Sequence, residues 1–363
     1  MGEWKEYKLG EVLTFQRGYD LPKSEMNGGD IPVAGSNGVI GYHNQYTTKG
    51  PGITIGRSGN IGVPRFYEDN FWAHNTTLFV KDFHGNDEKF MYYFLQTVDF
   101  TQFNTGSAVP SLNRNHIHEL SIFIPPLKEQ ERIASILSSL DDKIDLLHRE
   151  NKTLEAMAET IFRKWFIEEV RQEVLLGDVV ETTSGGTPSR KYEKYYQNGT
   201  IDWVKSKELN RSFLLKTEEK ITLEAVENSS AKFIPANSVL IAMYGATVGE
   251  YAIIAKEMTC NQAVCALKPN DNYPYTYLYL WAKFMQDDFL NLACGAAQQN
   301  ISQVLIKQQQ VCSDVDTVKQ FHSIVEPLFE KLKQNEIQLS SLEEMKNVIL
   351  HKLINNELNI NEL

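Results

Sequence analysis

The stretch "IFIPPLKEQERIASILSSLDDKI", Ile122–Ile144, decides the fold. Its first residues predict the end of a strand, and two prolines then stop the strand because proline cannot donate to a sheet. From Ile133 the apolar positions advance by four and three residues in turn, which is the heptad pattern of a coiled coil. This seam consists of Ile133, Leu137, Leu140, Ile144, Leu147, Asn151, Leu154, Ala158, Ile161 and Trp165.

The same organisation occurs a second time along the chain. "YKLGEVL" at 7–13 recurs as "VLLGDVV" at 174–180, and "HNTTLFV" from His74 recurs as "CNQAVCA" from Cys260. "GSAVPSLNRNHI" from 106 recurs as "GAAQQNISQVLI" from 295, and the helical seam recurs 188 residues further on. Because these matches keep their order, the sequence predicts a tandem duplication of a globular part followed by a helix.

Each globular part is rich in glycine, aromatic and β-branched residues. "PGITIGRSGNIGVPRFY" predicts a strand, a glycine turn and a second strand, whereas "YTYLYLWAKFMQDDFLNLA" has helical spacing. We therefore predict an α+β fold with two tandem mixed α/β domains, at 1–126 and 174–314. Two long helices, at 127–173 and 315–363, are expected to pair antiparallel as a coiled coil with a pseudo-two-fold internal repeat.

The two seams predict a register for the helix pair. If Ile133 and Trp165 lie opposite the far ends of the second seam, Asn151 faces Asn335 in one central layer. There each side-chain amide can satisfy the other, so that neither is buried without a partner. The alternative is that both asparagines are exposed and make no contact. Pro327 lies inside the second pattern and predicts a kink or a break in that helix.

Composition limits the possible functions. The net charge is −11, and none of the four predicted segments is basic overall, so any contact with DNA must come from a local arrangement of charges. No apolar run is long enough to cross a membrane, and "MGEWKEYKLGEV" lacks the apolar core of a signal peptide, which predicts a cytoplasmic protein. The four cysteines, Cys260, Cys265, Cys294 and Cys312, form no CxxC pair and are expected to be buried thiols.

Motifs of catalysis are missing from the sequence. It has no GxxxxGK[ST] phosphate loop and no HExxH, and its eight histidines show no metal-ligand spacing. His116 and His118 fit the alternation of a strand, and "TEEK" at 217–220 fits a solvated run of charges. We therefore predict no catalytic residue, no metal site and no cofactor bound by this chain.

The glycine loops "GRSGNIG" (56–62) and "YGATVG" (244–249) favour binding of nucleic acid. Such loops bring backbone amides and short polar side chains close to phosphates or base edges, where arginine suits guanine and asparagine suits adenine. The second globular part adds the basic stretches "SGGTPSRKYEKYY" and "DWVKSKEL" and the polar run "GAAQQN". The candidate DNA-binding residues are Arg57, Ser58, Asn60, Arg65, Arg190, Lys191, Lys205, Lys207, Tyr244, Gln298, Gln299 and Asn300.

The chain resembles the specificity subunit of type I restriction–modification systems. The residues that carry the resemblance are "SIFIPPLKEQERIASILSSLDDKID" after "GSAVPSLNRNHI", and "GGTPSRKY" with "NGTIDWVKSKEL" in the second half. The second copy departs from the pattern, since "KQQQVCSDVDTVKQ" lacks the two prolines.

This resemblance implies a non-catalytic protein with two target-recognition domains. Each domain would read one half of a bipartite, asymmetric site in double-stranded DNA, and the paired helices would set the gap between the halves. The helices would also dock two methyltransferase subunits, which use S-adenosylmethionine, and a motor-nuclease subunit would join for restriction.

Two other functions fit parts of the pattern. A coiled-coil scaffold could carry two globular arms that bind proteins, and it would show no sequence-dependent retention of DNA. An independent endonuclease would need a metal-binding cluster of carboxylates, which the sequence does not indicate.

Overall fold

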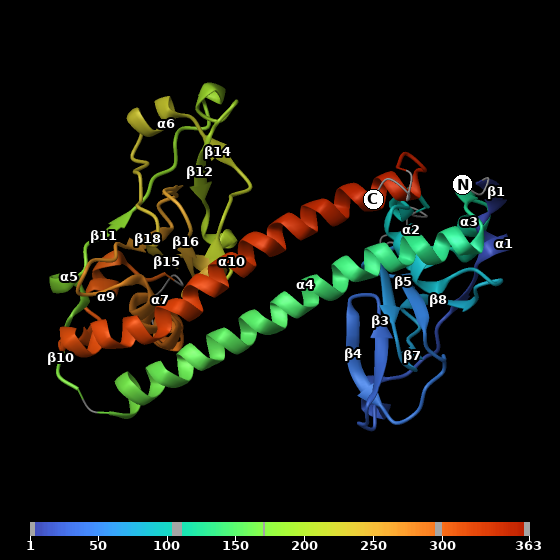
Figure 1. Cartoon of the computed structure of the whole chain (residues 1–363), viewed down its shortest axis with the longest axis horizontal. Helices are drawn as coiled ribbons and strands as arrows, with labels where there is room; N and C mark the ends of the chain where they lie inside the picture. Colours follow the sequence, from blue (N-terminus) through green and yellow to red (C-terminus); the bar gives the residue numbers. More distant parts are fainter. Residues whose placement is uncertain (1–3, 104–110, 170, 295–299, 359–363) are drawn as a thin grey trace. The chain divides into compact units, whose positions relative to one another are not determined.

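The computed structural model describes residues 4–103, 111–169, 171–294 and 300–358. The chain divides into two compact units: Met1–Asp145 with Leu342–Leu363, and Leu146–Ser341. Each unit contains one globular part and a section of both long helices (Figure 1). Because the helices pack onto the globular parts, the division falls inside the helices and not at their ends.

In the first unit, the first and the last strand of the globular part pair with each other in one β-ladder. Strand β1 (Lys5–Lys8) pairs antiparallel with β9 (Ser121–Ile124). Between them, a four-stranded sheet has the order β2–β8–β5–β6, with bounds Thr14–Arg17, Thr77–Asp82, Gly52–Gly56 and Pro64–Tyr67. A three-stranded sheet has the order β4–β3–β7, with bounds Gly38–His43, Ile31–Gly35 and Trp72–Ala73. The short helices are α1 (Leu9–Val12), α2 (Glu88–Gln96) and α3 (Arg114–His118).

The second unit repeats this plan. Strand β10 (Glu173–Leu175) pairs with β19 (Gln310–Cys312). A five-stranded sheet has the order β11–β18–β15–β16–β13, with bounds Thr182–Ser184, Val264–Leu267, Val239–Ala242, Tyr251–Ile254 and Phe213–Leu214. A three-stranded sheet has the order β14–β12–β17, with bounds Lys220–Ile221, Ile201–Val204 and Thr259–Cys260. The helices of this globular part are α5 (Leu176–Val179), α6 (Leu223–Glu227), α7 (Tyr275–Phe284), α8 (Gln286–Cys294) and α9 (Gln303–Lys307).

Two glycines show how closely the copies agree. A Cβ atom on Gly18 would lie 2.1 Å from the carbonyl oxygen of His74, and one on Gly185 would lie 1.8 Å from that of Cys260. His74 and Cys260 are matching positions in the two repeats of the sequence. Only glycine permits this approach of two backbones. The tandem duplication predicted from the sequence is therefore present in the fold.

The two long helices are α4 (Leu127–Phe162) and α10 (Val315–Ile354). α4 has 36 residues, which is about 54 Å of α-helix, and a π-helical turn, Arg163–Glu168, continues it. α10 has 40 residues and starts without the double proline that precedes α4.

Pro327 does not break the second helix, which contradicts one of the two outcomes predicted for it. α10 runs through Pro327, and Figure 1 draws it as one helix that bends in its first half. Proline removes one backbone hydrogen bond, but Val325 and Phe329 on either side are buried in the core of the second unit. Burial of such side chains is worth about 1.5–3 kcal/mol each, which is enough to offset the loss of that bond.

The helices pair antiparallel in the predicted register. In the second unit the rings of Trp165 and Phe321 lie 6.2 Å apart. In the first unit Ile133 and Leu353 are both buried in the same core. These are the mates that the two seams predict.

The asparagine layer lies within the second unit. Asn335 is 1 % exposed and donates from Nδ2 to Asn151 Oδ1 at 2.8 Å. It also donates to Glu150 Oε2 at 3.1 Å, and Asn151 donates to Glu336 Oε1 at 2.9 Å. The asparagines therefore face each other as predicted, but one hydrogen bond joins them instead of a mutual pair. Asn335 Oδ1 is buried without a hydrogen-bond partner among the described residues, so the prediction that the layer satisfies both amides is wrong for this atom. Charged carboxylates are stronger acceptors than amides, and they take the remaining donors.

The prediction of a strand at His116 and His118 is wrong. Both residues lie in helix α3, which Asn113 caps by accepting from the Asn115 backbone N–H at 3.0 Å. His118 Nε2 accepts from the Phe15 backbone N–H at 3.1 Å, so its role is to hold β2. A five-residue helix is too short for its periodicity to be distinguished from alternation.

The buried thiols predict that stability falls in alkali. Burial raises the pKa of Cys260 and of Cys265 to about 12, whereas an unfolded cysteine titrates near 8.5. The folded state therefore holds these protons more tightly, and the stability that they contribute is lost as the pH rises above about 9. Each thiol steepens the decline by about 1.4 kcal/mol per pH unit.

This decline can be measured by urea unfolding between about pH 8 and pH 9, below the pKa near 10 at which the tyrosines of the unfolded chain titrate. The variant C265A should show a shallower decline than the native chain. Equal slopes for the two proteins would contradict the assignment to the thiols.

Candidate nucleic-acid interface

The first glycine loop joins β5 to β6 as a tight turn. A Cβ atom on Gly56 would lie 1.7 Å from the carbonyl oxygen of Asn60, and Gly62 donates its N–H to the Gly56 carbonyl oxygen at 2.8 Å. Ser58 forms an isolated β-bridge with Ser111, and Asn60 is exposed at the tip. The loop is thus tied to the segment that precedes α3.

An arginine-lined hollow of about 770 Å³ lies beside this loop. Arg17 comes from the end of β2, Arg57 from the exit of β5 and Arg114 from the first turn of α3. The other lining residues that the structure describes are Gln16, Leu78, Ser111, Leu112 and Asn113, none of which is a carboxylate. Arg17 and Arg114 are not among the residues predicted from the sequence, because only the folded chain brings them next to Arg57.

Hydrogen bonds fix the position of Arg57 within this hollow. Its backbone N–H donates to the Thr76 carbonyl oxygen at 2.8 Å, and its own carbonyl oxygen accepts from Leu112 N–H at 2.9 Å. The guanidinium Nη1 donates to the Asn75 carbonyl oxygen at 3.3 Å. These hydrogen bonds hold the backbone of Arg57 on both sides, and they leave its positive charge at the hollow.

Arg65 is placed differently from the other candidates of this loop. It lies on β6 opposite Thr54, away from the lining of the hollow, and its Nε is buried without a hydrogen-bond partner among the described residues. Its charge opposes the rise in pKa that burial causes at Tyr67 and Tyr92. Arg65 therefore packs against the aromatic side of the sheet.

The second glycine loop has the same frame with other side chains. Tyr244 forms an isolated β-bridge with Asn300, as Ser58 does with Ser111 in the first copy. Asn300 Oδ1 also accepts from Gly245 N–H at 3.3 Å, and the Tyr244 side chain is 41 % exposed. Gln298 and Gln299 lie outside the described residues.

Three basic candidates of the second globular part pair with glutamates. Arg190 forms a two-pronged ion pair with Glu219, one of whose hydrogen bonds is 2.8 Å long. Lys205 lies 3.2 Å from Glu218 and 3.6 Å from Glu219, and Lys207 lies 2.7 Å from Glu218. The hydrogen bond from Arg190 lowers the pKa of Glu219, so these charges compensate one another. The "TEEK" run thus neutralises the basic cluster.

Arg190 also stacks on aromatic rings. Its guanidinium carbon lies 4.0 Å from the centre of the Tyr196 ring and 5.5 Å from that of Trp203. Such contacts hold the arginine against its own domain. Lys191 next to it is exposed.

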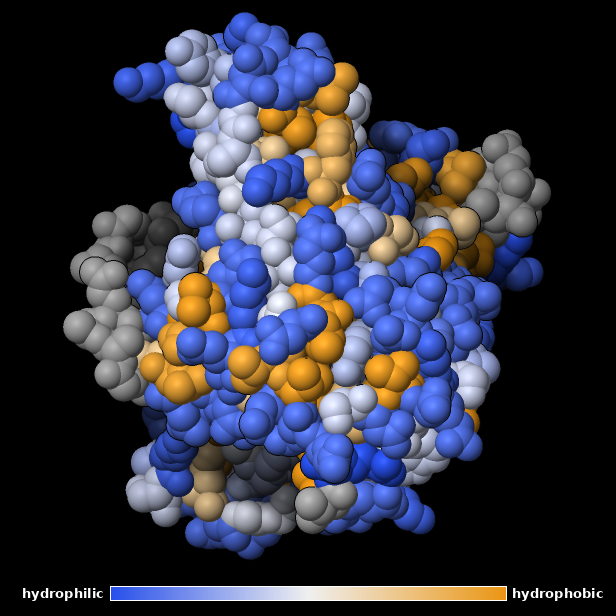
Figure 2. Space-filling model, turned by 90° about the vertical axis from the view of Figure 1, so that its left-hand side faces the viewer, coloured by the Kyte–Doolittle hydropathy of each residue, from blue (hydrophilic) through white to orange (hydrophobic). Residues whose placement is uncertain are grey.

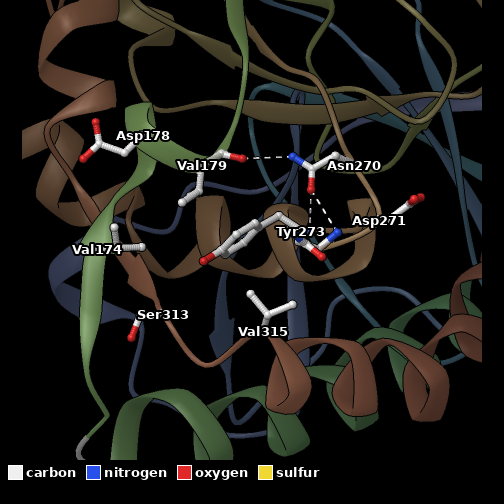
Figure 3. Close-up of a pocket in the computed structure, with 9 residues that line it drawn as sticks. Val174, Asp178, Val179, Asn270, Asp271, Tyr273, Ser313 and Val315 are labelled. Atoms are coloured by element: carbon white, nitrogen blue, oxygen red, sulfur yellow. Dashed lines mark hydrogen bonds between the residues drawn. The ribbon is translucent and has the colours of Figure 1, made fainter.

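A second hollow, of about 620 Å³, lies at the base of the second globular part (Figure 3). Asn270 shapes its rim, since its Nδ2 donates to the Val179 carbonyl oxygen at 2.9 Å and its Oδ1 accepts from Tyr273 N–H at 2.9 Å. The ionisable side chains of the lining other than Tyr273 are the carboxylates Asp178 and Asp271. A phosphate would be repelled there, so this hollow does not resemble the arginine-lined one.

In the described part of the chain, no cluster of three or more metal-ligating side chains occurs. Nor does any described helix have the length and apolarity needed to cross a membrane. Figure 2 shows a face that is largely hydrophilic, with apolar residues in separate patches.

Comparison with known families gives a match over most of the chain. Residues 1–156 and 169–312 match the model of the type I restriction modification DNA specificity domain. The chain belongs to this specificity-domain family. It carries two copies of the domain, and a long helix lies between them in the sequence. We call residues 4–126 and 174–312 the first and second recognition domains.

The curated relatives of this chain are named specificity subunits of type I restriction enzymes. The EcoR124I/EcoR124II specificity subunit of Escherichia coli is 30% identical over 321 residues, which cover 80% of this chain and 77% of the relative. The MjaIX specificity subunit of Methanocaldococcus jannaschii is 24% identical over 307 residues, covering 77% and 71%. The HindI specificity subunit of Haemophilus influenzae is 22% identical and covers 99% and 100%.

A solved structure agrees with the fold. The S subunit of a type I restriction–modification system from M. genitalium matches with a TM-score of 0.69 at 18% identity, over 97% of this chain and 96% of that one. These findings identify the chain as a specificity subunit, a non-catalytic component, and they do not favour the protein-binding scaffold.

Proposed function

We propose that this specificity subunit reads a bipartite, asymmetric site in double-stranded DNA, one half-site for each recognition domain. The observation that carries the proposal is the repetition of one backbone frame with different side chains in its loops. The bridge Ser58–Ser111 in the first domain corresponds to Tyr244–Asn300 in the second. Sequence is read by side chains at base edges, so a shared frame with different loops suits two different half-sites.

The paired helices are proposed to set the gap between the half-sites. Two half-sites on one face of DNA lie near multiples of a helical turn, about 34–36 Å apart. A helix of the length of α4 can bridge such a distance, and the layer of Asn151 and Asn335 supports a single register.

The helices are also proposed to dock two methyltransferase subunits, which bind S-adenosylmethionine, while this chain binds no cofactor. Exposed positions of α4 and the π-helical turn that continues it recur in α10, 188 residues further on, with similar side chains at three of four positions. The matching exposed pairs are Thr153 and Ser341, Met157 and Met345, Thr160 and Val348, and Lys164 and Lys352. Steps of four, three and four residues place each set on one helix face. A face that occurs twice suits two copies of one partner.

A motor-nuclease subunit is proposed to join this complex for restriction in the cytoplasm. The test of the whole proposal is methylome sequencing of a host that expresses this chain with its methyltransferase partner. A bipartite motif with a fixed gap is expected. Methylation without such a motif, or retention of proteins instead of DNA, would contradict the proposal and favour a scaffold.

The docking faces lead to a separate prediction about stoichiometry. Met157 and Met345 are each 50% exposed, and a glutamate at either position would place a charge in an apolar contact. We expect M157E and M345E each to lose one methyltransferase subunit, and the double variant to lose both. Native mass spectrometry counts the subunits. Exposed Leu175, which is 42% exposed outside these helices, provides the control variant L175E. Full assembly of the double variant would exclude these faces as the docking surface.

A further inference from the structure

Among the described residues of the second recognition domain, the positions equivalent to the three arginines of the hollow carry no positive charge. The repeats can be matched residue by residue through equivalent hydrogen bonds. Leu112 N–H donates to the Arg57 carbonyl oxygen at 2.9 Å, and Ile301 N–H donates to the Met243 carbonyl oxygen at 2.9 Å. Met243 therefore occupies the backbone position of Arg57, and its side chain is buried.

The other two arginines are matched in the same way. Arg114 opens α3 after its cap Asn113, and Gln303 opens α9 after its cap Ser302. Gln303 Nε2 donates to Thr182 Oγ1 at 2.7 Å, so that side chain is turned inward to β11.

Arg17 precedes Gly18, and Ser184 precedes the equivalent Gly185. Three positive charges in the first recognition domain thus correspond to serine, methionine and glutamine in the second.

The charges of the hollow are available to an anion. Asp20 lies 3.6 Å from Arg17, but both side chains are more than half exposed and such a surface pair is weak. The Arg57 guanidinium is oriented by the carbonyl oxygen of Asn75 and not by a carboxylate. Burial lowers the pKa of His118, and the nearby charge of Arg114 lowers it further. This effect also indicates a positive electrostatic field beside the hollow.

In the second domain three of the four basic candidates are paired with carboxylates, and only Lys191 is exposed without such a pair among the described residues. Arg190, Lys205 and Lys207 are compensated by Glu218 and Glu219. A phosphate that approached them would have to compete with two carboxylates that are already in contact.

We propose that the hollow of Arg17, Arg57 and Arg114 holds backbone phosphate of DNA, so that the first recognition domain supplies most of the salt-dependent affinity and the second domain reads its half-site with nearly neutral groups. This inference rests on the proposed function. Three guanidinium groups around one hollow suit phosphate oxygens better than a guanine edge, which a single arginine can occupy. The two halves of the subunit would then differ in how tightly they hold DNA.

The experiment replaces each arginine with the residue of the other repeat. The variants R17S, R57M, R114Q and their triple combination are prepared in the complex with the methyltransferase subunits. Binding to a duplex with the methylated motif and to a scrambled duplex is measured at several salt concentrations between about 50 and 200 mM. K81S removes an exposed charge from β8 in the same domain and is the matched control.

Each arginine that contacts a phosphate should reduce the slope of log K against log salt by about 0.9 when it is replaced. It should also weaken binding at low salt by about tenfold, on target and scrambled duplexes alike. The methylated motif should stay the same, and K81S should leave both quantities unchanged. Equal melting temperatures of the variants show that the domain is folded.

Three results would overturn the inference. The first is a triple variant with native affinity and native salt slope. The second is a relaxed half-motif with an unchanged slope, which would assign the arginines to base reading. The third is a loss in K81S equal to that in the triple variant, which would show an effect of net charge alone. If instead the native complex does not prefer the target duplex, the proposed function itself fails.

Discussion

Replacing residues 1–126 with the corresponding segment of a relative changes one half of the methylated motif and leaves the other half and the gap unchanged. The reason is that the loops at 56–62 and 111–114 belong to this segment, whereas the second recognition domain and the helices do not. The exchanged half-motif should be replaced completely, because each lost base contact costs about 1–3 kcal/mol and a half-site has several such contacts.

The exchanged segment must keep the packing of the first unit. Ile133 and Leu137 of α4 and Leu350 and Leu353 of α10 are buried in its core, so the incoming domain needs the apolar face that covers them. The matched control exchanges residues 174–314 and should change the other half-motif. Methylome sequencing of both chimaeras reads the outcome. A change of both halves by one exchange would show that the domains do not read DNA independently.

The second large effect is expected at the asparagine layer. In N151L, Asn335 loses its 2.8 Å acceptor while it stays buried, and in N335L, Asn151 loses the same hydrogen bond. Removing the acceptor of a buried amide costs about 1–3 kcal/mol. Asn335 keeps its hydrogen bond to Glu150, and the half-buried Asn151 keeps its hydrogen bond to Glu336, so each single cost should lie at the lower end of this range. In the double variant N151L/N335L both amides are gone and two leucines meet in the seam, so the cost should be well below the sum of the single costs.

Urea unfolding of the four proteins gives this coupling free energy. The exposed neighbour Lys152 offers a control, because K152L adds a leucine to the same turn of α4 outside the seam. Strictly additive costs of the two asparagine variants would mean that the amides do not share their layer in solution.

The helix pair is the part of the fold that sequence alone predicts best. Heptad spacing is a local signal, and symmetric antiparallel pairing of its two copies, 188 residues apart, gives the register. The mates Trp165 and Phe321 follow from it, as does the meeting of Asn151 and Asn335. The hydrogen bonds to Glu150 and Glu336 could not be predicted, because they depend on side-chain rotamers next to the seam. The prediction of a break at Pro327 considers only the local loss of a backbone hydrogen bond. In the folded chain, tertiary packing around Pro327 keeps the helix continuous.

The candidate interface was predicted less completely for a physical reason. Arg17 and Arg114 are 97 residues apart in the sequence and meet Arg57 only through sheet pairing and one backbone hydrogen bond. Conversely, Arg190 and Lys205 have the composition of a binding site, but the folded chain places Glu219 against both. Charge in a sequence window does not show which charges are compensated across a turn.

The ladders that open and close each recognition domain have a genetic consequence. Lys5 lies opposite Ile124, and Glu173 lies opposite Cys312, so the chain enters and leaves each domain at adjacent points. Whatever lies between these points can be exchanged as one cassette while the strands of the ladder and the helices stay in place. Recombination between related genes, with crossovers in the segments that encode the ladders, would therefore give whole new recognition domains on an intact frame. A lineage that carries this fold can change its DNA target in a single event, without passing through intermediates that no longer fold.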